Sequence, residues 1–493
     1  MKREFYGIDL GTTYSCIATF DSDDLVRVIP NKKGHMITPS AVYFDENNKM
    51  LVGQAAKAHL ADKPENTVVF IKREMSNQNY TVTINGQTYD PIQISSFILK
   101  HLVDFANEKR QNEEGKDPIY DVVITVPAYF GNLESTRTRE AGKMAGLNVL
   151  QLIDEPTAAA LSYGQKQQSD KTLMVYDLGG GTFDVSILKF KSGVADVIVT
   201  RGDHHLGGAD WDRAIAKLAM SKIGASFDSL STANQYKLLA AAEDCKQTLS
   251  EEDSATMVFN YKGVQTVDIT RQEFEASTLT LMNRTALLID EALEAKGLSV
   301  NDIDEVILVG GSSRMPMVRQ MIKKNLAIDA KLIDPDMAVA KGAALTAVQT
   351  TEPERVDETG VTVVNTKGSR GYGMKVTHAD LGRELCRNLI FRDDNKKIRR
   401  SATFATLADG QTCVDLVFYE NESNEEWKEI CENEKIQGRE DRIEWGKPVP
   451  KGTPLEVTFE RDESGCVRIF AECSGAKGEF EIVIGSTDKI VSR

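Results

Sequence analysis

Short apolar runs between turn residues open the chain and predict β-strands. These runs are Phe5–Leu10, Ser15–Phe20, Leu25–Ile29 and Ser40–Phe44. A helix is predicted from the spacing of Ile92–Lys109, and the composition of Gly53–Asp62 is also helical. The buried-type strand Asp121–Val126 then precedes a helix at Leu133–Ala145. Strands and helices that alternate in this way favour parallel pairing with crossover helices.

The same alternation returns in the middle of the chain. Strands are predicted at Thr172–Tyr176, Val185–Phe190, Val194–Thr200 and Glu305–Val309. Helices are predicted at Ser231–Leu249, from the capping box that starts at Thr270 to about Lys296, and at Pro335–Val348. The repeated plan indicates two related half-domains.

The pattern changes after residue 348. Residues 349–360 (QTTEPERVDETG) are polar, acidic and without periodicity, which predicts a linker. From residue 361 strand-like runs follow one another between turn signals, which predicts an all-β sandwich of around seven strands. The predicted domains are therefore residues 1–348 and 361–493, joined by the linker at 349–360.

Composition and charge narrow the class of protein. The 493 residues are 41% apolar and 27% charged, as in a soluble globular protein of roughly three domains. The net charge of −15 argues against a nucleic-acid or anionic-membrane binder. Seven scattered cysteines without a Cys-x-x-Cys pair favour reduced thiols in a cytoplasm over disulfides or a zinc site. Neither a signal peptide nor a membrane span is expected.

Two glycine turns carry the strongest chemical signal. The stretch Asp177–Asp184 (DLGGGTFD) joins two apolar strands, and Asp9–Ser15 (DLGTTYS) repeats the arrangement near the start. Glycines let the backbone turn sharply, and their bare amides form an anion-binding concavity. Asp9, Asp177 and Asp184 bracket the turns with the oxygen ligands that Mg²⁺ prefers, in part through water. One glycine turn alone is usually just a hairpin turn, but two predict a shared cleft that holds a polyphosphate.

Other polar stretches gain meaning beside such a cleft. Gly310–Arg314 and Gly207–Gly208 each precede a helix, where bare amides suit a phosphate or a nucleotide edge. A tight turn into a helix has the same pattern. Glu243, Lys246 and Ser250 share a helix face and are able to bond ribose and adenine, although a solvated face looks alike.

Lys72 and Glu155 are candidates for the chemistry itself. Lys72 follows an apolar run, so a partly enclosed ammonium there suits neutralisation of γ-phosphate charge. Glu155 starts a helix and suits the positioning of water, although acidic residues are common at helix starts. The adjacent His204 and His205 point in opposite directions on a strand, so a metal site there is rejected.

Together these stretches resemble the seventy-kilodalton heat-shock (DnaK-like) chaperone family. The resemblance covers residues 4–348 nearly continuously, through the motifs Gly7–Ser15, Val126–Phe130, Asp154–Ala160, Asp177–Asp184, Gly202–Asp212 and Val309–Pro316. It implies an α/β fold with an actin-like two-lobed ATPase domain of duplicated ribonuclease-H-like halves, followed by an all-β sandwich domain. Residues 361–485 resemble that peptide-binding sandwich more weakly, best at Asn388–Ile390 and Ser401–Val414.

The resemblance also implies roles by position. Lys72, Glu155, Thr182 and Asp177 match catalytic positions, and Asp9, Asp177 and Asp184 match the metal site, with Mg²⁺ and a candidate K⁺ as cations. A longer set is implied to bind ATP or ADP: Gly11, Thr12, Thr13, Tyr14, Gly179, Gly180, Gly181, Thr182, Gly207, Gly208, Glu243, Lys246, Ser250, Gly310, Gly311, Ser312, Arg314 and Asp336. Leu407 would arch over an extended peptide, and Val414 would line its central pocket.

Several positions depart from the family pattern. Gln247 replaces an arginine that stacks on adenine, Ser135 a relay arginine, and Gln151 an arginine used for J-domain partners. The apolar linker motif is replaced by Glu352–Glu358, and no helical lid is expected. Nucleotide binding is therefore a firmer expectation than lobe-to-lobe coupling or J-protein dependence.

The resulting hypothesis is a lidless, ATP-dependent chaperone that hydrolyses ATP to control the binding of extended polypeptide segments. Unfolded polypeptides and a nucleotide-exchange factor are the expected partners; a J-domain partner is doubtful, and nucleic acid and membranes are not expected. Two alternatives stay open. A small-molecule kinase of the actin-like fold would need an acceptor, and an ATP-binding interaction protein would show affinity without turnover.

Overall fold

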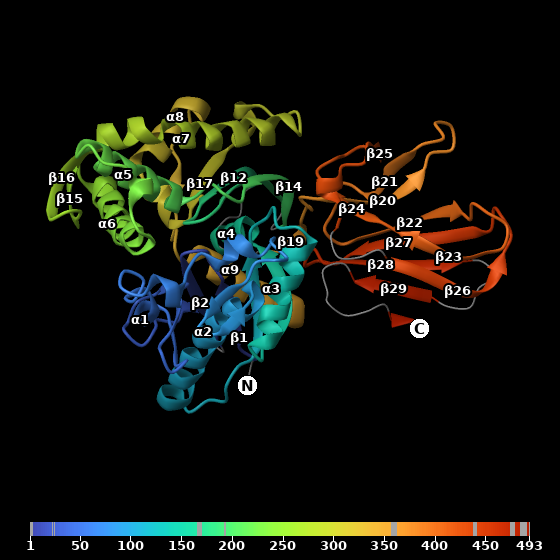
Figure 1. Ribbon diagram of the computed structural model, residues 1–493, viewed down its shortest axis with the longest axis horizontal. Helices are drawn as coiled ribbons and strands as arrows, with labels where there is room; N and C mark the ends of the chain where they lie inside the picture. Colours follow the sequence, from blue (N-terminus) through green and yellow to red (C-terminus); the bar gives the residue numbers. More distant parts are fainter. Residues whose placement is uncertain are drawn as a thin grey trace. The chain divides into compact units, whose positions relative to one another are not determined.

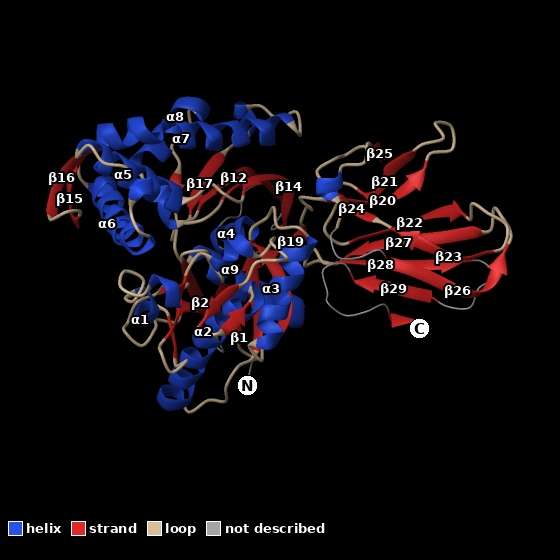
Figure 2. Ribbon diagram, in the orientation of Figure 1, coloured by secondary structure: helices blue, strands red, loops and turns tan. Residues whose placement is uncertain are grey.

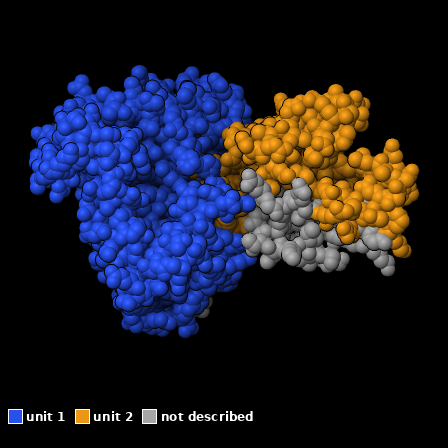
Figure 3. All heavy atoms as spheres, viewed as in Figure 1, with its two compact units in different colours: residues 1–128, 138–364 blue, residues 129–137, 365–493 orange. Residues whose placement is uncertain are grey.

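The chain forms two compact units in a computed structural model. The structure describes residues 3–21, 23, 25–164, 170–191, 194–355, 362–436, 441–473, 479–483 and 491–492. Unit 1 comprises residues 1–128 and 138–364, and unit 2 comprises residues 129–137 and 365–493 (Figure 3). Residues 356–360 of the predicted linker lie outside the described part.

The first sheet of unit 1 contains the N-terminal glycine hairpin, whose strands β1 and β2 are labelled in Figure 1. Its order is β11-β10-β1-β2-β3, with β4 paired to β2. The strands span Phe5–Asp9 (β1), Tyr14–Phe20 (β2), Val26–Val28 (β3), Thr38–Pro39 (β4), Asp121–Val126 (β10) and Asn148–Asp154 (β11). β1 runs antiparallel to β2 and parallel to β10, and β10 runs parallel to β11.

The second sheet repeats this plan around the central hairpin. Its order is β18-β17-β12-β13-β14-β19. The strands span Lys171–Leu178 (β12), Phe183–Lys191 (β13), Val194–Asp203 (β14), Glu305–Val309 (β17), Lys331–Leu332 (β18) and Thr362–Asn365 (β19). β12 is antiparallel to β13 and parallel to β17, which is parallel to β18. The same order and directions in both sheets confirm the predicted duplication.

Two alanine-rich helices pack against each other and against the sheets. They are α4 (Glu155–Gly164) and α9 (Ala338–Thr351). A Cβ on Gly342 of α9 would lie 1.8 Å from the carbonyl oxygen of Ala158 in α4, and one on Gly7 would lie 2.0 Å from the backbone nitrogen of Ala344. Glycine permits this close approach. α9 ends three residues later than the predicted helix.

The remaining helices and small sheets complete unit 1. The helices are α2 (Pro91–Glu114), α5 (Gly208–Lys222), α6 (Thr232–Glu251), α7 (Arg271–Glu294) and α8 (Pro316–Leu326), together with most of α3 (Asn132–Met144). The small sheets are β5-β6-β7 (Val42–Phe44, Met50–Val52, Thr67–Val68), β8-β9 (Val82–Ile84, Gln87–Tyr89) and β15-β16 (Ser254–Asn260, Val264–Thr270). In the described part of the chain, no helix has the length and apolar character needed to cross a bilayer.

The helix predicted at Gly53–Asp62 is mostly wrong, because α1 spans only Gln54–Lys57. Beyond α1, the backbone N–H groups of His59 and Leu60 bond to carbonyls three residues earlier, as in tight turns. The His59 ring stacks on Tyr43 with 4.0 Å between centroids. This tertiary contact fixes a turn where composition alone favoured a helix.

Unit 2 consists almost wholly of strands (Figure 2). One sheet has the order β24-β20-β21-β25, another has β22-β27-β28-β29-β30, and β23 pairs with β26. The strands span Gly371–Thr377 (β20), Glu384–Ile390 (β21), Ile398–Ala405 (β22), Gln411–Leu416 (β23), Phe418–Asn421 (β24), Trp427–Lys428 (β25), Asp441–Val449 (β26), Pro454–Arg461 (β27), Val467–Cys473 (β28), Glu479–Val483 (β29) and Val491–Ser492 (β30). Side chains from both larger sheets share one core, including Tyr372, Ile390, Val457 and Ile469. This arrangement confirms the predicted sandwich.

Candidate functional site

A cavity of about 1240 Å³ in unit 1 is lined by both glycine hairpins. Most of the residues singled out from the sequence of this unit line it: Asp9, Gly11, Thr12, Thr13, Tyr14, Lys72, Glu155, Asp177, Gly179, Gly180, Thr182, Glu243, Lys246, Ser250, Gly310, Gly311, Ser312, Arg314 and Asp336. Gly181, Gly207, Gly208 and Asp184 lie directly behind this lining, as the contacts below show. The structure thus brings residues from the two halves of unit 1 to one site.

The backbone of the second hairpin contacts side chains of the first hairpin. A Cβ on Gly180 would lie 2.1 Å from Thr13 Oγ1, and one on Gly181 would lie 2.5 Å from Thr12 Oγ1. Gly207 backs the second hairpin, since its Cβ would lie 2.6 Å from the backbone nitrogen of Gly181. Larger residues at these glycines would push the hairpins apart, so the sequence of the turns sets how closely they approach.

Strand pairing fixes the shape of each turn. The β12–β13 ladder continues through Asp177, which faces Asp184, and ends at the pair Leu178–Phe183. The Gly179 N–H then donates to the Thr182 carbonyl at 3.0 Å and closes the turn. In the first hairpin a Cβ on Gly11 would lie 1.9 Å from the Tyr14 carbonyl oxygen, so only glycine fits there.

Three aspartates stand beneath the hairpins, of which Asp177 and Asp184 are buried and Asp9 is half-buried. Burial and the charge of Glu155 raise the pKa of Asp9 to about 7, and Thr125 donates to Asp9 Oδ1 at 3.2 Å. Burial, followed by Glu155 and Asp9, raises the pKa of Asp177 well above its usual range. Burial, followed by Glu155 and Asp177, does the same to the pKa of Asp184. The site therefore gathers carboxyl groups where water is scarce, and their charged forms are disfavoured unless a cation compensates them.

The surroundings of Asp184 indicate whether this site suits a cation. It is 1% exposed, and neither of its carboxylate oxygens has a hydrogen-bond partner among the described residues. A buried carboxylate without a donor is costly unless a cation or its waters compensate it. Oxygen donors of this kind fit a hard divalent cation such as Mg²⁺. Within the described residues, no three carboxylate, histidine or cysteine side chains lie close enough to form a direct metal cage.

Lys72 and Glu155 form a buried ion pair in the cavity wall. Lys72 lies in a short 3₁₀ helix, Ile71–Glu74, which follows the left-handed residue Phe70 (φ 58°). Glu155 is the first residue of α4 and follows directly on β11. The two side chains are 6% and 10% exposed, so each charge depends on the other for compensation.

Residues of α6 line another wall of the cavity. Lys246 pairs with Asp212 at 2.7 Å and donates to the Gly208 carbonyl at 3.1 Å. Burial raises the pKa of Asp212 to about 6, although Lys246 opposes the shift. Ser250 Oγ donates to the Lys246 carbonyl at 2.9 Å, and Gln247 also faces the cavity. These contacts hold the α6 face in a fixed geometry.

Arg314 and Asp336 form a second polar pair in the cavity lining. Their side chains are joined at 2.6 Å. Arg314 belongs to the turn Gly311–Arg314 after β17, in which Gly310 adopts φ 78°. A Cβ on Gly310 would lie 2.4 Å from the Leu178 carbonyl oxygen, so this turn requires glycine for both its conformation and its close packing.

Contacts across the cavity include residues that the sequence did not single out. Arg73 donates to the Gly181 carbonyl at 3.0 and 2.7 Å and pairs with Asp210 at 2.8 Å. Its partners include a backbone carbonyl, so no motif could have pointed to it.

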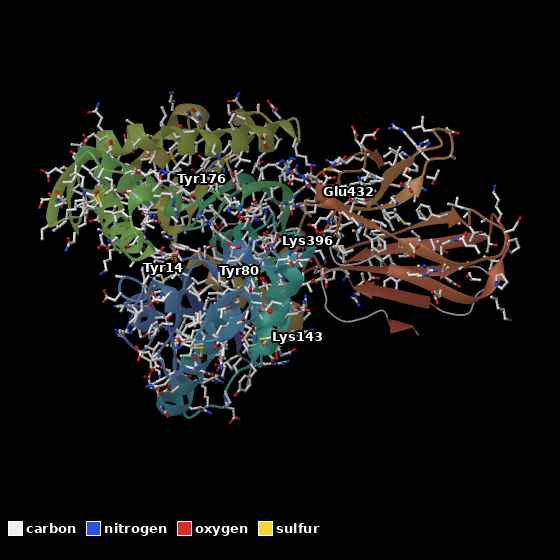
Figure 4. All side chains as sticks on the ribbon, viewed as in Figure 1. Tyr14, Tyr80, Lys143, Tyr176, Lys396 and Glu432 are labelled. Carbon is white, nitrogen blue, oxygen red and sulfur yellow. The ribbon has the colours of Figure 1, made fainter. Side chains whose placement is uncertain are left out.

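Lys57 makes a second bridge across the cavity. Its Nζ contacts Glu243 and the Tyr14 hydroxyl at 2.8 Å each, and Tyr14 (labelled in Figure 4) donates to Glu243 at 3.1 Å. Burial alone would lower the pKa of Lys57, but Glu243 and Tyr14 raise it. No periodic pattern marks Lys57 in the sequence.

The two candidate peptide-binding residues belong to unit 2. Leu407 follows β22 and is 70% exposed, and its N–H donates to Gln411 Oε1 at 3.0 Å. Val414 lies in β23 and packs, half-buried, against the sandwich core. Of the positions that depart from the family pattern, Gln151 accepts a hydrogen bond from Thr350 Oγ1 at 2.8 Å.

Comparison with known proteins agrees with this architecture. The family model described as "Hsp70 protein" matches residues 5–492. The chain is 38% identical to the chaperone protein DnaK of Thermotoga petrophila and to that of Thermotoga maritima. Each alignment spans 512 residues and covers 99% of this chain and 82% of the relative. The chain belongs to the Hsp70 family.

Proposed function

We infer that the chain is an ATP-dependent molecular chaperone of the DnaK type. The observation that carries this inference is the meeting of two glycine hairpins in one cavity, with Gly180 and Gly181 against Thr13 and Thr12. Membership of the Hsp70 family supports ATP hydrolysis coupled to the binding of polypeptides. The protein is thus an enzyme that cleaves ATP.

We propose that the β- and γ-phosphates lie in the cavity, against the lining that both hairpins provide. Backbone amides of bare turns bind anions without a reorganisation cost, because their geometry is set by the fold. The residues proposed to hold the phosphates are Gly11, Thr12, Thr13, Tyr14, Gly179, Gly180, Gly181, Thr182, Gly207 and Gly208. The contact distances between the two hairpins support this proposal, since a triphosphate there would touch both.

We propose that Asp9, Asp177 and Asp184 hold Mg²⁺ through its water shell. Mg²⁺ keeps several of its waters when it binds carboxylates, and the uncompensated oxygens of Asp184 support a cation here. When bound, the cation neutralises charge on the phosphate oxygens. We also propose that K⁺ binds at the same group of carboxylates.

We propose that the Lys72–Glu155 pair, together with Thr182 and Asp177, carries out the hydrolysis. Water attacks the γ-phosphorus as the bond to the bridging oxygen of ADP breaks, and the products are ADP, phosphate and a proton. The Lys72 ammonium is oriented by Glu155 and offers positive charge to the γ-phosphoryl group. The Glu155 carboxylate is a hydrogen-bond acceptor for the attacking water. Positioning and charge stabilisation supply the rate, because no covalent intermediate is required.

The nucleoside is proposed to lie along α6 and the turn after β17. Its candidate contacts are Glu243, Lys246, Ser250, Gly310, Gly311, Ser312, Arg314 and Asp336, all of which line the cavity. Gln247 also faces this space and would offer the base an amide in place of a guanidinium plane. An amide stacks more weakly on a purine, so we expect a modest affinity for the base.

Client binding is proposed for unit 2, where Leu407 lies in the β22–β23 connection and Val414 lies in β23. An extended polypeptide would add main-chain hydrogen bonds and insert one apolar side chain. Leu407 is 70% exposed, so its side chain is accessible to a bound polypeptide. A nucleotide-exchange factor is a proposed partner, dependence on a J-domain partner stays doubtful, and a cytoplasmic location is proposed.

Steady-state ATP hydrolysis by the full chain, with and without an extended apolar peptide, tests this function. We expect magnesium-dependent phosphate release without any added acceptor, and faster release when peptide is present. Phosphate transfer to a sugar or small acid would instead indicate a kinase. ATP binding without turnover in both conditions would indicate a protein that only binds nucleotide.

A further inference from the structure

Residues 129–137 pack with the β-sandwich and form part of unit 2. The Asn132 N–H donates to the buried Tyr372 hydroxyl at 3.0 Å, and Asn132 Oδ1 accepts the Val467 N–H at 2.5 Å. Ser369 Oγ donates to the Phe130 carbonyl at 3.4 Å. These bonds reach β20, β28 and the residues before β20, so the segment contacts both larger sheets of the sandwich.

Two carboxylates meet beside this segment at Gly131. A Cβ on Gly131 would lie 1.8 Å from Glu420 Oε1 and 3.2 Å from Glu134 Oε2, so both oxygens crowd one point. Glu134 is 7% exposed, and the side chain of Glu420 is 19% exposed. Two carboxylates this close, with little access to water, repel each other when both are ionised.

The charged groups around the pair compensate only part of this repulsion. Arg370 Nε lies 3.9 Å from Glu420, but the Arg370 guanidinium also binds Glu422. Arg370, followed by Arg137, attracts Glu134, and the Tyr372 hydroxyl and the Asn132 N–H bond to Glu420. Arg461 lies close to Tyr372 but donates to the carbonyls of residues 370, 394, 395 and 396.

The balance of these groups favours one retained proton. Burial and the neighbouring Glu134 raise the pKa of Glu420 to about 7, although Arg370 opposes the shift. Burial also raises the pKa of Glu134. The sandwich with the segment in place therefore binds more protons than the separated parts, in which both carboxyls face water.

We propose that Glu134 and Glu420 share a proton that fastens residues 129–137 to the β-sandwich, so that this attachment weakens as the pH rises. The sign follows from linkage. Attachment is fully stable below the ordinary pKa of a free glutamate, and stability is lost as the pH rises through the raised pKa of the pair. The proposal concerns unit 2 alone and does not depend on the proposed chaperone function.

Hydrogen exchange of the full chain, followed by mass spectrometry of peptides that cover residues 129–137, tests the proposal. After correction for the intrinsic pH dependence of exchange, we expect protection to fall ~30-fold between pH 5.5 and 8.5, from the shift of Glu420 alone. In Glu420→Gln, whose neutral amide replaces the protonated acid, protection should be nearly constant over this range.

Two further variants complete the test. Glu134→Gln should also remove most of the pH dependence, which keeps the test available if Glu420→Gln does not fold. Glu472→Gln changes an exposed glutamate of β28 and should behave like the natural chain. Constant protection in the natural chain would overturn the proposal. The proposal would also be overturned if protection fell with pH in both glutamine variants as it does in the natural chain. It would be overturned as well if both variants lost protection at every pH.

Discussion

At the scale of single residues, the site depends on charged side chains that are shielded from water and compensate one another. Lys72 and Glu155 are both buried, and neither would be stable there as an isolated ion. The aspartates beneath the hairpins have raised pKa values for the same reason. The cavity is therefore poised to accept a cation and an anionic ligand together.

Lys72→Ala should abolish hydrolysis while nucleotide binding persists. Removal of one charge aimed at the transition state typically costs on the order of 10²–10³ in kcat, whereas the bare amides of the hairpins remain. Single-turnover hydrolysis and ATP titration measure the two effects separately. Lys100→Ala, an exposed lysine paired with Asp104, serves as the control. Unchanged turnover in Lys72→Ala would remove this residue from its proposed role.

Gly207→Ala should weaken nucleotide binding by displacing the second hairpin. Its Cβ would lie within 2.6 Å of backbone atoms of Gly181 and Thr182, which cannot move as a flexible side chain does. We expect at least a tenfold increase in the Kd for ATP, or ~1.4 kcal/mol. Gly452→Ala introduces strain at a turn of unit 2 (φ 84°) and should leave ATP affinity unchanged. Normal ATP binding by Gly207→Ala would argue against a phosphate site at this hairpin.

The sequence predicted the two hairpin turns because the backbone itself carries that signal. The Asp-Leu-Gly turns predicted two hairpins because glycine is required wherever a Cβ would collide. Arg73 was not found, because it binds a carbonyl 108 residues away. The crowding of Glu134 and Glu420 depends on tertiary packing and has no local pattern either.

At the scale of elements, the repeated strand plan was predictable and several element ends were not. The order and direction of strands around β1 and around β12 match, as the two Asp-Leu-Gly motifs suggested. The helix at Ser231–Leu249 is present as α6 (Thr232–Glu251), capped by Ser231. The helix at Gly53–Asp62 is short because packing of His59 on Tyr43 overrides composition. No local sequence pattern predicts that residues 129–137 pack with the sandwich.

Arg73→Ala should speed nucleotide release, since Arg73 ties the 3₁₀ turn Ile71–Glu74 to the second hairpin. Hydrogen bonds to charged groups contribute ~1.5–3 kcal/mol, so an increase in the dissociation rate of roughly ten- to hundredfold is expected. Stopped-flow release of a fluorescent ADP measures the rate. Arg27→Ala, which removes an exposed guanidinium that pairs with Asp21 outside the cavity lining, should have no effect. A dissociation rate equal to that of the natural chain would show that this contact does not restrain the cleft.

At the scale of the whole molecule, two compact units share one chain, and we expect their proposed functions to be separable by mutation. Leu407→Ala should weaken binding of an extended apolar peptide about five- to thirtyfold, the effect of losing ~1–2 kcal/mol of apolar burial. Its melting temperature should not change, because Leu407 is 70% exposed. Fluorescence anisotropy of a labelled peptide measures the affinity, with Leu25→Ala, half exposed in unit 1, as the control. Equal peptide affinity in Leu407→Ala would exclude this residue from the client site.

The central claim is that one triphosphate is gripped by both hairpins, and calorimetric titration of magnesium and ATP tests it most directly. The natural chain should bind one ATP, and Thr13→Val and Thr182→Val should each weaken binding at least ~10-fold, because each removes a hydroxyl facing a charged ligand. The double variant should lose less than the product of the single losses, since both hydroxyls act on one ligand. Independent binding of two ATP molecules, or natural affinity after the change in either hairpin, would contradict the claim.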